Sequence, residues 1–363
     1  MIKSKNALLI LDGLYIAGAQ RHCLDLMDAF YESGFECTLI VVGSAGGKWA
    51  DKFLSKSLYV ILDVKDNLNW STIRQITSNL QFDFAVAHLT YPARWALLNL
   101  PRQIRTFAHF HSELSEHEFL TNGELLEMEN TFDAIFFPAV ATLKHYLALL
   151  EDNNIKIKED GKWKVLPNAI PRFITGVKKN KRSQRVLKDC LSIAVISRLD
   201  IDKISIPLLT ETLLNLVKNK LCFQVRIVGD GDCRDEVIQA LSVANLAPFS
   251  KMLGFIDEHI EEIYNWADVV FLPSKRESMP YVLLESISYG CPIVLPNIGI
   301  AGVMTLPRIV HRFPQNNAEE ASRLIIKASA EIMQHDVIDA GVDGEILGYK
   351  KWVELVKSMY NLY

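Results

Sequence analysis

Short apolar runs alternate with segments of helical period along nearly the whole chain. In its first half the runs read ALLILDG, CTLIVVG, LYVILDV, FDFAVAHL, RTFAHFH, AIFFPAV and KVLPNAI, and in its second half LSIAVISRL, QVRIVGDG, MLGFI, DVVFLPS and PIVLP. Unbroken apolar runs are typical of strands buried on both faces, and their alternation with helices indicates parallel sheets. The pattern predicts an α/β protein with two separate series of such units.

A basic, turn-rich stretch without periodicity, TGVKKNKRSQR, separates the two series. We interpret it as a solvated linker, and contact of its charges with a membrane surface or a partner is the alternative. We predict a Rossmann-like domain over residues 1–175 and a second over residues 186–345, facing each other across a cleft. In residues 346–363 the apolar positions share one helix face, which we expect to pack back on the first domain. These positions are Leu347, Trp352, Leu355, Val356 and Met359.

The composition is that of a globular protein: 49% of the 363 residues are hydrophobic, enough for two cores. A net charge of −4 gives no reason to expect nucleic acid as a partner. Six cysteines occur without a C-x-x-C pair, so we expect neither a zinc site nor a disulfide framework. We therefore expect the protein to be located in the cytoplasm. Asp12 and Gly13 interrupt the N-terminal apolar run, which we interpret as a strand, and no run reaches membrane-spanning length.

The segment SKRESMPYVLLESISYGCPIV contains two glutamates on either side of an apolar run. It follows the strand-like run DVVFLPS, so we expect a loop and then a helix. Ser278 is a candidate capping residue, Pro280 suits the first helical position, and Gly290 is expected to end the helix. Glu277 then lies in the loop and Glu285 in the second helical turn.

Loops at the carboxyl ends of parallel strands bind ligands, and helix N-termini attract phosphate. Carboxylates beside such a site would be badly placed if they touched the phosphate itself. They are better placed to accept hydrogen bonds from hydroxyl groups of the two groups that flank a diphosphate. A nucleotide sugar has this chemistry, with a ribose diol at one end and sugar hydroxyls at the other. The plainer alternative is that Glu277 and Glu285 are solvated surface charges.

Two cations follow the first strand of the second series, in the stretch ISRLDIDKIS. Arg198 offers a planar fork and Lys203 a compact charge, and together they can neutralise a diphosphate. Alternatively they pair with Asp200 and Asp202 as ordinary loop residues. Their occurrence in the same domain as the two glutamates favours the phosphate interpretation.

The stretch RIVGDGDCRDE resembles the metal-binding D-x-D of another class of sugar transferases at Asp230 and Asp232. A strand that turns directly into a helix explains Gly229 and Gly231 without a metal. We therefore expect no metal here and expect Asp232 to cap the next helix.

In the first domain, Gly18 and Ala19 stand at the start of the first helix, where small residues let a phosphate approach the backbone. A glycine that serves only the turn is the alternative. His109 and His111 end the fifth strand on one side, and we select His111 as the residue that reaches the cleft. A buried, hydrogen-bonded histidine is the alternative, and the absence of a third ligand at a suitable spacing argues against zinc.

These motifs resemble the GT-B-fold glycosyltransferases of family 4, which transfer sugars from nucleotide diphosphate donors with retention at the anomeric carbon. The resemblance covers most of the chain. It includes AGAQRHCLDL for the small-residue loop, LPNAI before the linker, SRLDIDK for the Arg-x4-Lys clamp and VGDGDCRDE. The most specific element is ESMPYVLLESISYGCPIV, which contains the family's E-x7-E spacing.

The resemblance implies a role for each candidate residue. Glu277 would contact hydroxyls of the donor sugar, Glu285 would bind the ribose, and His111 would line the donor-sugar side of the cleft. Arg198 and Lys203 would hold the diphosphate and stabilise its charge as it leaves. Backbone N–H groups would be brought toward the phosphates by a short segment at the helix start. This segment is Ser278, Met279, Pro280 and Tyr281.

The implied enzyme is retaining, needs neither a metal nor a cofactor beyond the nucleotide sugar, and acts on a glycan or lipid-linked acceptor of bacterial surface polysaccharide synthesis. The first domain would bind the acceptor and the second the donor. Exposed residues of the first domain could approach a membrane peripherally, or be scattered surface residues. They are Arg94, Trp95, Arg102 and Arg105.

Two departures from the family pattern leave alternatives open. Gly18-Ala19 replaces the usual Gly-Gly, and Val303 stands near the position of the glutamate in the usual Gly-Gly-x-x-Glu. A catalytically silent GT-B subunit that supports a partner transferase is therefore one rival, and a nucleotide-sugar epimerase of the same fold is another. The presence of Glu277, Glu285 and the two clamp cations argues against a silent subunit.

Overall fold

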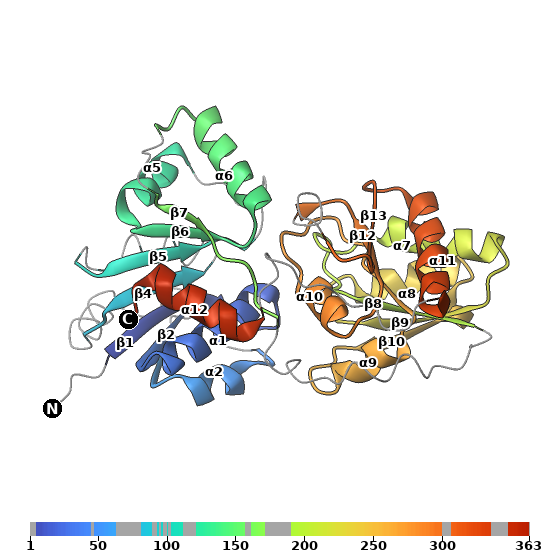
Figure 1. Cartoon of the computed structure of the whole chain (residues 1–363), viewed down its shortest axis with the longest axis horizontal. Helices are drawn as coiled ribbons and strands as arrows, with labels where there is room; N and C mark the ends of the chain where they lie inside the picture. Colours follow the sequence, from blue (N-terminus) through green and yellow to red (C-terminus); the bar gives the residue numbers. More distant parts are fainter. Residues whose placement is uncertain are drawn as a thin grey trace. The chain divides into compact units, whose positions relative to one another are not determined.

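The computed structural model divides the chain into two compact units, Met1–Ala169 with Tyr349–Tyr363, and Ile170–Gly348 (Figure 1). Each unit is described by itself. The stretch expected to be a linker lies outside the described residues. The structure describes residues 5–44, 47–62, 81–88, 93, 96, 100, 103–111, 121–156, 161–170, 190–299, 306–334 and 348–362.

The first unit is built on a seven-stranded parallel sheet in the order β3-β2-β1-β4-β5-β6-β7. Its strands are β1 (Lys5–Gly13), β2 (Phe35–Ser44), β3 (Tyr59–Leu62), β4 (Phe84–His88), β5 (Arg105–His109), β6 (Ala134–Phe137) and β7 (Trp163–Val165). Its helices are α1 (Gly18–Glu32), α2 (Ala50–Lys56), α5 (Asn122–Thr131), α6 (Val140–Asp152) and α12 (Tyr349–Tyr360). The predicted parallel sheet of the first half is confirmed.

The last helix, α12, packs against α1 of the first unit, although most of the chain separates the two in sequence (Figure 1). Trp352 and Val356 are fully buried on its inner face. The indole Nε1 of Trp352 also donates to the backbone oxygen of Pro167 at 2.7 Å. Burial of each large apolar side chain contributes roughly 1.5–3 kcal/mol, so this amphipathic face holds the C-terminal helix in the first unit.

The second unit has a six-stranded parallel sheet in the order β10-β9-β8-β11-β12-β13. Its strands are β8 (Leu191–Ile196), β9 (Phe223–Val228), β10 (Ser250–Gly254), β11 (Val269–Phe271), β12 (Ile293–Pro296) and β13 (Val310–Phe313). Its α-helices are α7 (Ile206–Lys218), α8 (Arg234–Val243), α9 (Ile260–Trp266), α10 (Tyr281–Ser288) and α11 (Ala318–Gln334), with a 3₁₀ turn at Ala247–Phe249. Taken in chain order, this is the 3-2-1-4-5-6 arrangement of a Rossmann sheet.

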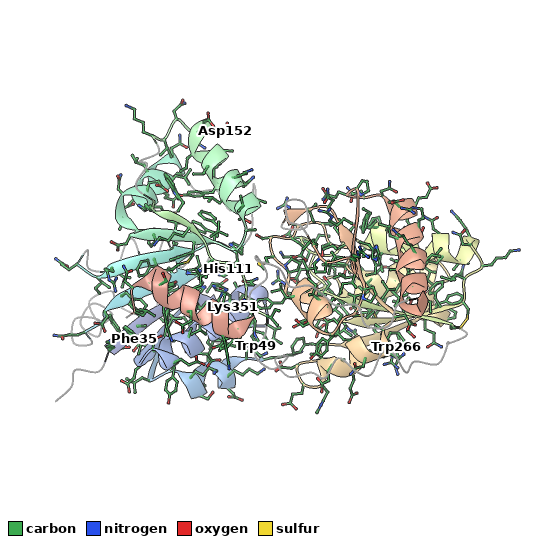
Figure 2. All side chains as sticks on the ribbon, in the orientation of Figure 1. Phe35, Trp49, His111, Asp152, Trp266 and Lys351 are labelled. Atoms are coloured by element: carbon green, nitrogen blue, oxygen red, sulfur yellow. A yellow bond between two sulfur atoms is a disulfide. The ribbon has the colours of Figure 1, made fainter. Side chains whose placement is uncertain are left out.

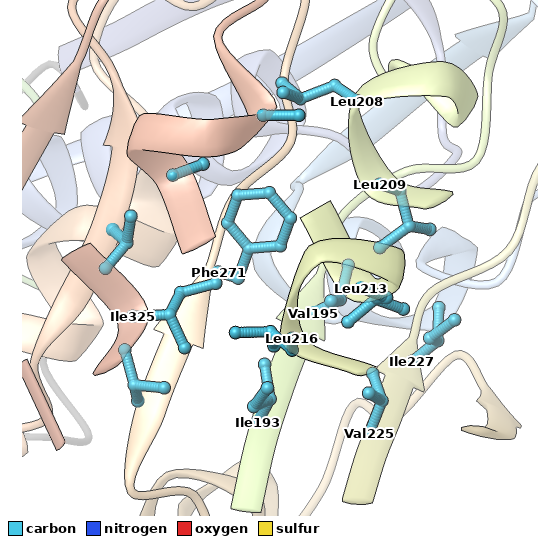
Figure 3. Packing of buried hydrophobic residues seen from close by; sticks show 14 of the residues in the cluster. Ile193, Val195, Leu208, Leu209, Leu213, Leu216, Val225, Ile227, Phe271 and Ile325 are labelled. Atoms are coloured by element: carbon cyan, nitrogen blue, oxygen red, sulfur yellow. The ribbon is translucent and has the colours of Figure 1, made fainter. Parts of the chain in front are cut away.

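The core of the second unit lies where α7 and α11 cover one face of this sheet, as the close view shows (Figure 3). Helix α7 presents leucines at helical spacing, and the neighbouring strands contribute β-branched residues. Together these side chains exclude water from one face of the sheet and leave its carboxyl edge for ligand loops. The labelled members include Leu209, Leu213, Leu216, Ile193, Val195, Val225, Ile227, Phe271 and Ile325.

The hydrophobic pattern did not predict the sixth strand of this sheet, β13. Its sequence, VHRF, has two polar residues between the apolar ones, and the strand lies at the sheet edge beside β12. Arg312 is exposed there and Phe313 is fully buried. A search for continuous apolar runs therefore missed a strand that is half exposed.

The expectation that no cysteines pair is wrong for one pair. Cys190 and Cys222 form a disulfide although 32 residues separate them in sequence. They directly precede Leu191 and Phe223, which are register partners in β8 and β9. Parallel pairing of these strands brings the two cysteines together, and their spacing along the chain gives no sign of it.

Within the described residues, the structure contains no helix that is both long and apolar enough to cross a bilayer. Of the four residues considered for membrane contact, Arg94, Trp95 and Arg102 lie outside those residues. Arg105 begins β5, and its guanidinium carbon lies 5.8 Å from the ring centroids of Phe84 and Phe107. These cation–π contacts within the first unit explain the position of Arg105 without contact to a membrane.

Candidate functional site

The strand order of the second sheet reverses at β8 and β11, which are direct neighbours. The chain leaves β8 toward one edge of the sheet and leaves β11 toward the other. Loops that diverge in this way at the carboxyl ends of parallel strands form the usual ligand site of an open α/β sheet. The stretch with Arg198 and Lys203 follows β8, and the stretch with Glu277 follows β11, so both predicted motifs lie at this point.

Backbone hydrogen bonds hold these two loops side by side. The amide of Ser205 donates to the oxygen of Pro273, and that of Lys275 to the oxygen of Lys203, both at 2.8 Å. Between these bonds, Ile204 and Ser274 form an isolated antiparallel bridge. The structure thus brings Lys203 next to the segment that carries Glu277, a contact that the sequence alone did not establish.

The two predicted clamp cations differ in their present partners. A guanidinium nitrogen of Arg198 lies 3.3 Å from a carboxylate oxygen of Asp200, and the two side chains are 39% and 33% exposed. Lys203 is half-buried, and among the described residues its ammonium group has no hydrogen-bond or ion-pair partner. An exposed ion pair such as that of Arg198 contributes little stability and can exchange for an anionic ligand.

Glu277 is held by a short hydrogen bond within its own loop. The hydroxyl of Ser274 donates to Glu277 Oε1 at 2.8 Å, and Ser274 is almost completely buried. The loop after β12 also packs against this segment, since a Cβ atom on Gly299 would lie 2.0 Å from the backbone oxygen of Glu277. Gly299 has φ +56°, so glycine suits it for both its conformation and its closeness.

The helix after this loop, α10, begins one residue later than predicted. Pro280 has extended backbone angles and is the N-cap residue, and Tyr281 is the first helical residue, so the N-cap position falls on Pro280 and not on the predicted Ser278. Ser278 and Met279 are both buried. The fixed φ of proline suits the extended backbone before a helix, so Pro280 can occupy the N-cap position although it offers no capping side chain.

The predicted end of α10 is confirmed. Gly290 follows the last residues of the helix with φ +62°, in the left-handed conformation common after helix C-termini. Glu285 lies in the second turn, as expected from the sequence, and its side chain is half-buried. The loop and the helix therefore place the two glutamates on the same strand–helix connection.

Tyr264 of α9 donates its hydroxyl to Glu285 Oε2 at 2.6 Å. Its ring is fully buried and stacks on Tyr289, with ring centroids 4.8 Å apart. Burial, together with the charge of Glu285, raises the pKa of the Tyr264 hydroxyl well above its usual range, so it remains a donor. Sequence analysis missed Tyr264 because it precedes Glu285 by 21 residues and belongs to another helix.

The glycines of the VGDGDCRDE stretch are explained by a close approach to the clamp loop. A Cβ atom on Gly229 would lie 1.8 Å from the oxygen of Ser197, and one on Gly231 would lie 2.4 Å from a carboxylate oxygen of Asp200.

The prediction that Asp232 caps α8 is wrong. Cys233 occupies the N-cap position without a side-chain hydrogen bond, and Asp232 is exposed one residue earlier.

In the first unit, Gly18 and Ala19 are the first two residues of α1, as predicted. Gly18 is exposed and Ala19 is buried.

His111 lies two residues beyond the end of β5 and is half-buried, and Figure 2 labels it. His109 is buried and hydrogen-bonded to the hydroxyl of Tyr360, which is the alternative that the sequence left open for it.

The argument that His109 and His111 have no third metal-ligating neighbour is wrong. His88, the last residue of β4, joins them, and one ligand atom of each of the three side chains lies within 4.8 Å of the others. Sequence spacing could not show this because β4 and β5 are paired strands separated by a long connection. A histidine at the carboxyl end of a neighbouring predicted strand was the signal available.

The departure noted at Val303 cannot be compared with the structure, because residue 303 lies outside the described residues. The described part of that loop reaches Gly299, which contacts the Glu277 segment as stated above. The predicted donor-site residues of the second unit therefore meet at one sheet edge. Gly18 and Ala19 follow β1 and His111 follows β5, so these residues lie at the carboxyl edge of the first sheet.

Comparison with solved structures identifies the fold. The structure of HepE from Anabaena, in complex with UDP-glucose, superposes with a TM-score of 0.74 over 98% of this chain and 100% of that chain, at 16% sequence identity. The chain therefore has the GT-B fold, and the prediction of two Rossmann-like domains is confirmed.

Sequence comparison gives the relatives of the second unit. Residues 191–330 match the family described as glycosyl transferases group 1. An uncharacterised glycosyltransferase of Methanocaldococcus jannaschii, MJ1607, is 35% identical over 77 residues, which are 20% of this chain and 19% of that protein. The amylovoran biosynthesis glycosyltransferase AmsK of Erwinia amylovora is 28% identical over 124 residues, or 32% of this chain and 30% of that protein. The matched stretches thus span less than a third of either relative's length.

Proposed function

We propose that the protein is a retaining glycosyltransferase that transfers a sugar from a nucleoside diphosphate donor to a glycan or lipid-linked acceptor. One observation supports this most. The two clamp cations and the two glutamates converge on the switch point of the sheet, within the part of the chain that matches glycosyl transferases group 1. A surface charge pattern without function has no reason to gather there.

The donor would bind with its diphosphate between Lys203, Arg198 and the N-terminus of α10. The diphosphate could displace Asp200 from Arg198, and Lys203 offers a half-buried ammonium group beside the same loop. Backbone N–H groups at the start of α10 add partial positive charge. Glu285, oriented by Tyr264, would accept hydrogen bonds from the ribose, and Glu277, oriented by Ser274, would accept them from the sugar.

In the transfer step the bond between the anomeric carbon and the diphosphate oxygen breaks, and negative charge accumulates on the leaving diphosphate. An acceptor hydroxyl oxygen forms the new bond to the anomeric carbon, and its proton passes to the leaving diphosphate. Arg198 and Lys203 stabilise that charge, and the carboxylate of Glu277 stabilises positive charge that develops on the sugar. Side chains and helix N–H groups supply the positive charge that metals provide elsewhere. We therefore propose transfer without a divalent metal or any cofactor beyond the donor.

The names of related proteins indicate the class of substrate. HepE has been solved with UDP-glucose, and AmsK takes part in amylovoran biosynthesis. By analogy we propose a UDP-sugar donor and a role in bacterial surface polysaccharide synthesis, with the acceptor bound mainly by the first unit. We further propose that the protein acts in the cytoplasm, in peripheral contact with the membrane where its acceptor is lipid-linked.

A thermal-shift screen tests the donor site. Uridine, UMP, UDP and UDP-sugars, with the corresponding guanosine series, would be added to the full chain. A ligand that binds only the folded state at one hundred times its Kd stabilises it by about 2.7 kcal/mol, so diphosphates should raise Tm and nucleosides should not. Lys203→Ala should reduce the shift, and Lys218→Ala, an exposed lysine at the end of α7, should not.

The active donor would then be incubated with acceptor glycans and analysed by mass spectrometry. Transfer of the sugar supports the proposal. A chain that stabilises no nucleotide fits a silent subunit, and a donor whose sugar is isomerised without an acceptor indicates an epimerase. Either result contradicts the transferase proposal.

A further inference from the structure

Four histidines meet at the carboxyl edge of the first sheet. His88 ends β4, His111 follows the end of β5 and His109 is the last residue of that strand, while His22 lies in the second turn of α1. The ring centroid of His22 is 5.0 Å from that of His111 and 5.1 Å from that of His109. Since β1 and β4 are neighbours in the strand order, this histidine cluster occupies the switch point of its own sheet.

The spacing of the ring nitrogens is close to that of metal ligands. His88, His109 and His111 each offer a nitrogen within 4.8 Å of the other two, and His88 Nδ1 lies 3.0 Å from His111 Nε2. Nitrogens bound tetrahedrally to zinc at about 2.1 Å are separated by about 3.4 Å. Small side-chain rotations would therefore bring the three rings onto one ion.

Two nitrogens of this cluster are buried without a hydrogen-bond partner. They are Nε2 of His88 and Nε2 of His22, and both residues are almost fully buried. Leaving a buried polar atom without a partner costs about 1–3 kcal/mol, so such atoms are rare unless an ion or a water occupies the site. Two such atoms in one histidine cluster indicate a place built for a partner from outside the chain.

The neighbours of the histidine cluster resemble the outer shell of a metal site. His22 Nδ1 lies 3.0 Å from Asn168 Oδ1, and because an amide oxygen only accepts, this nitrogen carries the proton. The lone pair of His22 is then on the orphaned Nε2. The hydroxyl of Tyr360 is hydrogen-bonded to His109 and orients that ring. Partners of this kind fix the tautomer and direction of metal-binding histidines.

The ligand type also indicates the kind of ion. Imidazole nitrogens suit zinc, copper, iron and nickel. Carboxylates are absent from the three-residue group found among the described residues, which disfavours calcium and magnesium.

We propose that His88, His109 and His111 bind one divalent transition-metal ion of the zinc class, with His22 beside it as a further ligand. The ion would tie the ends of β4 and β5 to α1 at the ligand edge of the first sheet. This site belongs to the other unit from the proposed donor site. The proposal does not rest on the transfer reaction, and it assigns His111 to the metal in place of the donor-sugar contact that the family resemblance implied.

Metal binding can be measured on the full chain without a donor or a polyhistidine tag. Protein freed of metal would be titrated with Co²⁺, whose visible absorption reports a low-coordinate nitrogen site, and then with Zn²⁺ as a competitor. We expect one equivalent of Co²⁺ to bind, Zn²⁺ to displace it, and Zn²⁺ to raise the Tm of the wild type. His88→Gln should weaken Co²⁺ affinity at least tenfold and abolish the Zn²⁺-dependent Tm increase.

His145→Gln is the matched control, because His145 is an exposed histidine of α6 in the same unit, and its affinity should equal that of the wild type. If His88→Gln does not fold, the half-buried His111→Gln replaces it. Asn168→Ala should weaken binding about tenfold without abolishing it, as expected for an outer-shell partner. Absence of Co²⁺ binding, or equal binding by the wild type and His111→Gln, would show that the histidines form only a hydrogen-bonded cluster.

Discussion

Tyr264→Phe removes one oxygen atom from the proposed donor site and leaves the surrounding packing in place. The ring of Tyr264 stacks on Tyr289, and its hydroxyl donates to Glu285 at 2.6 Å. Phenylalanine keeps the stacked ring and removes only the donor. The substitution therefore tests whether the orientation of Glu285 matters for donor binding.

The structure also indicates how much Tyr264→Phe should weaken donor binding. A hydrogen bond to a charged group contributes about 1.5–3 kcal/mol, and the 2.6 Å length places this bond among the charge-assisted ones. Glu285 is half-buried, so water can replace part of the lost interaction. We therefore expect the lower end, about 1.5 kcal/mol, which corresponds to a roughly tenfold increase in the donor KM. Because ribose binding is the same in the ground and transition states, kcat should change little.

Steady-state kinetics with the donor found in the screen measures both constants. Tyr289→Phe is the matched control, since it removes a hydroxyl from the neighbouring stacked ring, and we expect less than a twofold change in KM. Thermal unfolding should show that both variants remain folded. A kcat decrease at constant KM, or a KM equal to that of the wild type, would refute the role assigned to Tyr264 and Glu285.

The remaining predictions concern the clamp, the metal requirement and the two glutamates. Lys203→Ala and Arg198→Ala should each weaken binding of the nucleoside diphosphate far more than binding of the nucleoside, as measured by calorimetry; equal weakening would mean that neither cation contacts phosphate. Chelation should leave transfer intact, and loss of activity that manganese or magnesium restores would return the Asp230–Asp232 stretch as a ligand set. Glu285→Ala should mainly raise the donor KM, whereas Glu277→Gln should lower kcat about one hundredfold, or roughly 2.7 kcal/mol of barrier. Wild-type turnover by Glu277→Gln would make that carboxylate a surface charge.

Much of the fold could be predicted from local patterns. Strands buried on both faces need unbroken apolar sequence, so β8 and β11 are visible as LSIAVI and VVF. The edge strand β13 was missed because one of its faces is partly exposed and two polar residues interrupt its apolar sequence. Local capping was also predicted less well, since the backbone angles of Pro280 and Cys233 decide which residue begins each helix.

The position of the proposed donor site followed from sequence to a similar degree. Residues directly after parallel strands must lie at the carboxyl edge of a sheet, so Lys203 and Glu277 were placed there without coordinates. That Lys203 and Glu277 lie on neighbouring loops could not be predicted without the strand order. The two loops pair through Ser205 and Lys275 because β8 and β11 are adjacent in the sheet.

The α/β architecture, the alternation of strands and helices, and the residues at strand ends could be predicted from local patterns, because these depend on periods of two to four residues. Which distant side chains meet depends on how the strands and helices pack. Strand pairing joins Cys190 to Cys222 and His88 to His111, and helix packing places the hydroxyl of Tyr264 on Glu285. Such contacts leave no periodic signal, because their geometry arises from strand order and helix packing across the sheet rather than from neighbours along the chain.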